Sequence, residues 1–302
     1  MLIDWGDAEL RLTDRVSVLV GATNGTYPSG NSLLVKGTSE SVVIDPSVDV
    51  VARGGVPVRI DAVLNSHSHE DHMPGNGFFS SARVHIHEAD LPGARSLEGL
   101  MDVFGLQNPE NRRAFEEIVV EEFHFTPRPD AQGFSHGHVF DLGGIAIEAV
   151  HLPGHTRGHS GFRISDEVFF LSDIDLTGFG PYYGDAWSDL DDFEDSLRRV
   201  RDEEARYYVT FHHKGVIEGR ENFRTMVDQF ASVIDRRHAA MLEFLEEPHS
   251  IDEMIEHRFI YRPHVEMAIV QDVERRSAEL HVARMVERGE AVEIEPGRYR
   301  TT

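Results

Sequence analysis

The sequence of 302 residues contains no cysteine and only two lysines, Lys36 and Lys214. Without cysteine, disulfide bonds and thiolate ligands are excluded, so any metal ion must be held by histidine and carboxylate side chains. No run of about 18 apolar residues occurs, so no membrane-spanning helix is expected. The N-terminal residues lack the basic start and apolar core of a signal peptide, and a cytoplasmic location is therefore expected.

Positive charge is also scarce, and the formal net charge is −24. Such a chain repels phosphate backbones over long range, which disfavours nucleic acid as a partner. We expect a small-molecule substrate and no membrane partner, and a homodimer is compatible with the sequence. The length suits one large domain, or one large domain with a smaller one.

Metal-binding side chains are concentrated in one short stretch, residues 65–76. His67, His69, Asp71 and His72 lie within six residues, directly after residues 60–64, which are predicted to form a buried strand. Imidazole and carboxylate groups are preferred ligands of zinc and similar divalent ions. In an extended chain, two histidines separated by one residue face the same way, whereas the next two ligands follow where the chain turns. The stretch therefore suits two metal ions rather than one.

This stretch resembles the HxHxDH signature of the metallo-β-lactamase superfamily and matches it at all four positions. The resemblance covers about residues 16–220. It implies a four-layer αββα fold of the α/β class, with a catalytic domain over residues 1–220. A predicted hairpin, residues 31–45, precedes the motif as it does in the family. The resemblance implies that Asp45 shapes the floor of the site, and the alternative is an aspartate that caps a turn.

The resemblance implies three further ligands. His155 lies in a Pro-Gly-His-Thr element like that of the family and would complete the first metal site with His67 and His69. Asp173 ends a predicted buried strand where the family places a carboxylate that bridges two ions, although the family usually has glycine at the position of Ser172. Asp175 is the second choice for this role.

The last ligand is His212 or His213, because both follow the predicted strand 207–211. The strand length favours His212, whereas the glycine that follows fits His213. Six further histidines are interpreted as supporting or solvated groups: His85, His87, His136, His138, His151 and His159.

Residues 89–135 interrupt the strand pattern and are predicted to be an insertion with a helix at 110–122 that covers the active site. Tyr182 and Tyr183 are candidate substrate-binding residues, and the alternative is that they pack a loop.

From residue 221 onwards the pattern becomes helical, at 226–246, from a capping box at Ser250 and Glu253, and at 265–288, followed by a hairpin at 291–300. Residues 221–302 therefore resemble a small winged-helix-like C-terminal domain. Acidic residues outnumber basic ones in it, which argues against binding of DNA or RNA. We expect this domain to pack over the active-site face or to mediate dimers.

The resemblance implies a dinuclear metal-dependent hydrolase with two divalent ions, zinc first and iron or manganese as alternatives. A metal-bound hydroxide would attack a small thioester, lactone or ester, as in glyoxalase-II-like and lactonase-like members. Asp71 would be both a ligand and the catalytic residue that orients the water or moves its proton. The alternatives are a phosphodiesterase or ribonuclease of the same fold and a non-catalytic metal-binding protein.

Overall fold

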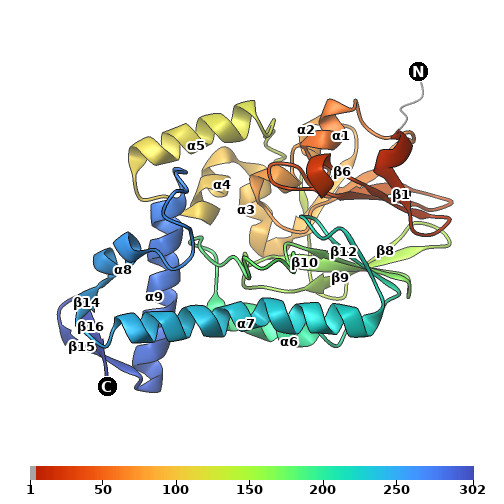
Figure 1. The fold of residues 1–302 in the computed structure, drawn as a ribbon. Coiled ribbons are helices and arrows are strands. Elements are labelled where there is room, and N and C mark those ends of the chain that lie inside the picture. Colours follow the sequence, from red (N-terminus) through yellow and green to blue (C-terminus); the bar gives the residue numbers. More distant parts are fainter. Residues whose placement is uncertain (1–4) are drawn as a thin grey trace.

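The computed structural model describes residues 5–302, and its centre consists of two β-sheets packed face to face (Figure 1). Within this range the first sheet has seven strands in the order β1 to β7. Strands β1 to β4 are antiparallel, and β4 to β7 are parallel. Their bounds are β1 (Glu9–Arg11), β2 (Val16–Leu19), β3 (Ser32–Lys36), β4 (Ser41–Ile44), β5 (Ala62–Leu64), β6 (Arg83–His87) and β7 (Gln132–Phe134).

The second sheet of the described chain has six strands in the order β13-β12-β11-β10-β9-β8. Only β11 and β12 are parallel neighbours in it, and the other pairs are antiparallel. The bounds are β8 (Val139–Asp141), β9 (Ala146–His151), β10 (Ser160–Ile164), β11 (Val168–Ser172), β12 (Tyr207–Thr210) and β13 (Val216–Glu218).

Successive side chains of a strand point to opposite faces of the sheet, so each central strand packs against two layers. Leu33 of β3 and Phe170 of β11 belong to the hydrophobic cluster between the two sheets. Their neighbours Leu34 and Phe169 point outwards and pack into two separate clusters beneath helices. Buried residues on both faces of a strand therefore require helices on both outer sides.

Helices cover both outer faces (Figure 1). The first sheet carries α1 (Val48–Ala52), α2 (Gly75–Phe78), α3 (Leu91–Arg95), α4 (Leu97–Phe104) and α5 (Pro109–Glu121). The second sheet carries α6 (Leu190–Val200) and the first half of α7 (Arg220–Phe244). Short 3₁₀ turns lie at Gly6–Ala8, Ala22–Asn24, Glu70–His72 and Glu88–Asp90. The predicted αββα arrangement is thus confirmed.

The segment 89–135 differs in one respect from the predicted insertion. It contains the expected helix, α5, but it also contains β7, which pairs with β6 and extends the first sheet. Gln132 and Gly133 have low strand propensity, so the sequence gives little sign of this strand. The backbone pairing with β6 places it instead.

The C-terminal region is helical, as predicted, and ends in a small sheet. After α7 come α8 (Ile251–His257) and α9 (Val270–Arg288), and the three-stranded sheet consists of β14 (His249–Ser250), β16 (Arg298–Thr301) and β15 (Ala291–Glu295). The capping box of Ser250 and Glu253 begins α8, which confirms the predicted helix start. A separate hydrophobic cluster holds these elements together.

The predicted boundary between residues 220 and 221 stays a prediction. It coincides with the start of α7, whose first half packs on the second sheet and whose second half packs in the C-terminal cluster. Among residues 5–302, no helix has the length and apolar character needed to cross a membrane.

Candidate metal centre

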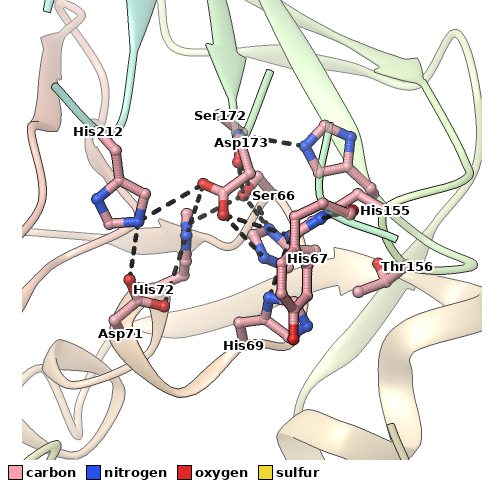
Figure 2. A network of polar contacts seen from close by, with 12 residues as sticks. Ser66, His67, His69, Asp71, His72, His155, Thr156, Ser172, Asp173 and His212 are labelled. Atoms are coloured by element: carbon pink, nitrogen blue, oxygen red, sulfur yellow. Dashed lines mark hydrogen bonds and ion pairs between the residues drawn. The ribbon is translucent and has the colours of Figure 1, made fainter. Parts of the chain in front are cut away.

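Four loops meet at one edge of the two sheets, each directly after a strand (Figure 2). The loop after β5 contributes His67, His69, Asp71 and His72. The turn between β9 and β10 contributes His155, the end of β11 contributes Asp173, and the end of β12 contributes His212. Strand ends of a packed sandwich are held rigidly, so side chains distant in sequence reach one point.

The first group contains His67, His69, His155 and Asp173. His155 Nε2 lies 3.1 Å from His69 Nδ1 and 3.3 Å from Asp173 Oδ2. His67 Nε2 lies 4.0 Å from the same carboxylate oxygen. The four ligand atoms thus surround one small space.

The second group contains Asp71, His72 and His212. His212 Nε2 lies 3.0 Å from Asp71 Oδ2, and His72 Nε2 lies 3.7 Å from Asp71 Oδ1. Asp173 turns its other oxygen, Oδ1, to this group, 3.0 Å from His72 Nε2 and 3.9 Å from His212 Nε2. One carboxylate therefore faces both groups, between them in Figure 2.

These atoms fit divalent cations. Nε2 of His67 and of His72, Oδ2 of Asp71 and Oδ1 of Asp173 are buried and form no well-oriented hydrogen bond in the described chain, and the polar contacts they make are with other atoms of the two groups. Buried polar atoms without partners are costly, and a cation would satisfy all four. Two ligand atoms at about 2.0–2.1 Å from a tetrahedral zinc ion are separated by roughly 3.3–3.4 Å, close to the spacings found here. The residues therefore fit two metal ions.

In three of these histidines, the ring nitrogen that points away from the ligand group, Nδ1, forms a hydrogen bond with another part of the protein. His155 Nδ1 lies 2.9 Å from the Tyr182 carbonyl oxygen, and His212 Nδ1 lies 2.8 Å from the Gly25 carbonyl oxygen. Nδ1 of each ring donates to the carbonyl, which leaves the Nε2 lone pair free for a metal ion. His72 Nδ1 is held in the same way, 2.9 Å from Asp45 Oδ2.

Asp45 is fully buried beneath the site, as the prediction for the site floor requires. Its carboxylate accepts hydrogen bonds from Ser66 N at 2.7 Å and Ser66 Oγ at 2.6 Å, in addition to His72. Ser66 Oγ also lies 2.6 Å from Ser172 Oγ. Ser172 has φ 53°, a left-handed conformation that favours glycine. A left-handed backbone explains why the family that the chain resembles usually has glycine at this position. In this chain the position is serine, and its hydroxyl contacts Ser66.

The charges of the two groups depend strongly on each other. Burial raises the pKa of the Asp173 carboxyl, but the His72 and His212 imidazoles outweigh burial and hold it well below its usual range. Burial lowers the pKa of His212, but Asp173 and Asp71 outweigh it and raise this pKa to about 9. The carboxylates thus favour positive charge at these histidines, a charge that a bound metal ion would supply with the release of protons.

The structure shows the positions of several residues whose roles the sequence left undecided. His212 lies in the second group, whereas His213 Nδ1 faces Thr26 Oγ1 at 3.4 Å. His159 is buried, and its Nε2 accepts from the Asp173 backbone N–H at 3.3 Å, so it helps to position Asp173. Asp175 accepts from Thr177 N and Oγ1, both at 3.0 Å, and is outside both groups.

The two predicted substrate-binding tyrosines have different environments. Tyr182 lines the cavity beside the metal-binding groups, and its hydroxyl donates to Asp185 Oδ1 at 2.9 Å. The prediction for Tyr183 is wrong. Its side chain is buried in the core under α6 and α7, and its hydroxyl lies 2.9 Å from His281 Nε2. The two neighbouring side chains thus lie on different sides of the segment, one at the cavity and the other in the core.

Two residues at the site, Asp185 and Glu70, were missed from the sequence. Asp185 is buried, with Oδ2 2.9 Å from His69 Nε2. Glu70 lies inside the HxHxDH stretch, faces the cavity and accepts from the Tyr27 hydroxyl at 2.9 Å. Burial, together with Asp71, raises the pKa of Glu70 to about 8. The position of Glu70 between two ligands was a usable signal, whereas Asp185 belongs to no recognisable pattern.

A cavity of about 300 Å³ opens above the two groups. Its walls are mostly aromatic and apolar, and they come from α4, α5, the segment around residue 180 and the loop between α8 and α9. The lining residues other than the metal-binding groups are Tyr27, Glu70, Phe104, Phe115, Asp175, Phe179, Gly180, Tyr182, His213, Tyr261, Met267 and Ile269. The insertion thus borders the site, as predicted.

Two known proteins are similar in sequence to about half of this chain. An N-acyl homoserine lactonase from Bacillus sp is 26% identical over 168 residues, which cover 55% of this chain and 54% of that protein. An acyl-coenzyme A thioesterase from Bos taurus is 25% identical over 173 residues, which cover 50% of this chain and 61% of that protein. The chain thus spans only between half and two thirds of these relatives.

Structural similarity extends over nearly the whole chain. The crystal structure of a metallo-beta-lactamase family protein from Thermus thermophilus has a TM-score of 0.71 and covers 97% of this chain and 100% of that chain. At 20% sequence identity, this likeness shows the fold alone. The family model of the metallo-beta-lactamase superfamily matches residues 25–213, a range that contains every predicted ligand. The chain therefore belongs to the metallo-beta-lactamase superfamily.

Proposed function

We propose that this protein is a dinuclear metal-dependent hydrolase of small, uncharged thioesters, lactones or esters. The observation that carries the proposal is the position of Asp173, whose two oxygens face two separate groups of ligands. A carboxylate that bridges two cations is a recurrent part of two-metal hydrolase sites. We propose zinc as the metal, with iron and manganese as the alternatives.

Two bound divalent ions would supply a water of lowered pKa and Lewis acidity toward a carbonyl oxygen. The side chains of the protein would orient this water. Burial raises the pKa of Asp71, but His72 and His212 outweigh burial and lower it, so this carboxylate stays ionised and can accept a hydrogen bond from water. We propose Asp71 as the residue that orients the attacking water. Phe104 and Tyr182 line the cavity beside the metal-binding groups.

The cavity wall supports an uncharged acyl substrate. Six aromatic side chains line it, whereas no lysine or arginine of the described chain is among its lining residues. Phosphate recognition normally relies on these cationic side chains, so the wall argues against the phosphodiesterase and ribonuclease alternatives. The names of the lactonase and thioesterase relatives also indicate acyl substrates. The homodimer and the cytoplasmic location stay predictions.

Elemental analysis of the purified protein, together with hydrolysis assays, tests this function. About two ions of zinc, iron or manganese per chain are expected, and a chelator should abolish hydrolysis of uncharged thioesters, lactones and esters until metal is restored. Metal binding without any such hydrolysis would support the non-catalytic alternative. A protein that binds no metal after reconstitution would contradict the proposal altogether.

A further inference from the structure

One wall of the cavity comes from outside the region matched by the family model. Tyr261, Met267 and Ile269 line the cavity and lie in the loop between α8 and α9, beyond residue 213. They face the same space as Phe104 and Phe115 of the first sheet's helices. This wall is apolar, and no motif in the sequence points to it.

A buried carboxylate holds the backbone of this loop. Glu274 of α9 is 2% exposed and accepts hydrogen bonds from three successive backbone N–H groups. The distances are 2.9 Å from Phe259 N, 3.1 Å from Ile260 N and 2.7 Å from Tyr261 N. The three hydrogen bonds offset only part of the cost of burying this carboxyl, because burial still raises the pKa of Glu274. Without the carboxyl, three backbone N–H groups would lack this partner. The carboxylate therefore sets the position of Tyr261.

Further contacts fix the rest of the loop. Arg258 has φ 62°, and its guanidinium donates to the Val265 carbonyl at 2.9 Å. Asn111 of α5 donates to the Ala268 carbonyl at 3.0 Å, so the loop is joined to the helices over the first sheet. The Tyr261 ring packs on the cavity residue Phe179 with ring centroids 5.6 Å apart. In Figure 1, the segment that precedes α9 lies beside α5, in agreement with these contacts.

We propose that the loop 258–269 is the subsite for the apolar acyl chain of the substrate, and that Glu274 is the residue that positions it. This inference rests on the proposed function for the reaction, although binding of the chain does not require catalysis. Burial of each additional methylene against such a wall strengthens binding by about fourfold. The hydrolysed bond would lie at the metal-binding groups, and the chain would extend toward Tyr261.

Calorimetric binding of a series of fatty amides tests the subsite without requiring turnover. Acetamide, butyramide and octanamide share one head group and differ only in the apolar chain. The wild-type protein is expected to bind more tightly as the chain lengthens. Tyr261→Ala and Glu274→Gln should each weaken the binding of octanamide by about tenfold or more and leave the binding of acetamide unchanged. Glu287→Gln, a substitution at an exposed position on the same helix, should behave as wild type.

Ester hydrolysis by the metal-loaded variants gives the second readout. Glu274→Gln should raise KM for an octanoyl ester and leave both kcat and the values for an acetyl ester unchanged. The double variant Glu274→Gln with Tyr261→Ala should be no worse than Tyr261→Ala, because both act through the same ring. Circular dichroism and metal content show whether each variant is folded, and Tyr261→Ala tests the wall even if Glu274→Gln does not fold.

The outcomes separate the subsite from the reaction. Amide affinity that does not depend on chain length in the wild type would overturn the subsite. So would a Tyr261→Ala variant, or a folded Glu274→Gln variant, that keeps the wild-type dependence. Chain-length-dependent amide binding by a metal-loaded protein that hydrolyses no ester would support the subsite and contradict only the hydrolase proposal.

Discussion

The two-sheet region and the C-terminal segment, residues 221–302, contribute to the same cavity in different ways. All seven residues of the two metal-binding groups come from loops of the two-sheet region. Within the described chain, the C-terminal segment contributes three side chains to the cavity wall and none to the metal-binding groups. The two-sheet region supplies the metal-binding groups and most of the cavity wall, and the C-terminal segment adds an apolar part of that wall.

The C-terminal segment also supports the metal-binding groups from a distance. Arg276 of α9 donates to the backbone carbonyls of Asp185 at 3.3 Å and Ser188 at 2.8 Å. Asp185 contacts His69, and the Ser188 hydroxyl donates to the His155 carbonyl at 2.8 Å. A helix without any motif residue thus reaches two metal-binding histidines through one intermediate each. The lesson is that a motif identifies the candidate ligands, whereas much of their surroundings comes from residues outside the motif.

The largest effect is expected at the residue that joins the two metal-binding groups. Asp173→Asn keeps the shape of the side chain but removes its charge and one of its two acceptor oxygens. Metal content should fall to about one ion per chain or less, and kcat/KM should fall by at least about 10³-fold. Asp166→Asn, in the exposed turn between β10 and β11, is the matched control. Full metal content and activity in Asp173→Asn would contradict the bridging role.

Two carboxylates that hold metal-binding histidines allow a direct comparison. Asp45 lies 2.9 Å from His72 Nδ1, and Asp185 lies 2.9 Å from His69 Nε2. Asn substitution at either position should lower metal affinity by about 10–100-fold, because a metal-binding histidine loses the partner that orients it. Competition with a chelator should show that Asp45→Asn weakens the second group and Asp185→Asn the first. Weaker metal binding at the other group in either variant would contradict these assignments.

The fold could be predicted where the local pattern determines the element. The hairpin of β3 and β4 alternates apolar residues between two buried faces, and Ser250 begins α8 with its own capping hydrogen bonds. The strand β7 could not be predicted in this way, because Gln132 and Gly133 carry no strand preference and pairing with β6 decides their conformation. Elements that depend on a distant partner leave little trace in their own residues.

The same distinction holds at the site. His67, His69, Asp71 and His72 are adjacent in the chain, so their common role was visible before their geometry was known. Asp185 contacts His69 only because of the way its loop packs. A single aspartate in a loop does not indicate such a contact in the sequence. Glu274 did leave a signal, because it lies within the buried stripe of α9 between Val273 and Ser277. A charged residue on an apolar helix face indicates a buried partner.

Two neighbouring arginines on α9 test whether the C-terminal segment supports the two-sheet region. Arg276→Ala removes hydrogen bonds to two backbone carbonyls and should lower the free energy of unfolding by about 1–2 kcal/mol. Arg275 pairs with the exposed Asp252, so Arg275→Ala should change this free energy by less than about 0.5 kcal/mol. Denaturant unfolding measures both values. Equal effects of the two substitutions would show that α9 contributes only general packing.

The smallest effect is expected for Ser250→Ala, which removes the cap of α8 without touching the cavity. Loss of a helix cap lowers the free energy of unfolding by about 1 kcal/mol, which denaturant unfolding can measure. Because Glu274 and Arg258 hold the loop 258–269 by contacts that do not involve Ser250, KM for long acyl esters should stay at the wild-type value. An increase in this KM would mean that the start of α8, and not Glu274 alone, determines the position of Tyr261. The C-terminal segment would then act on the cavity as one cooperative unit.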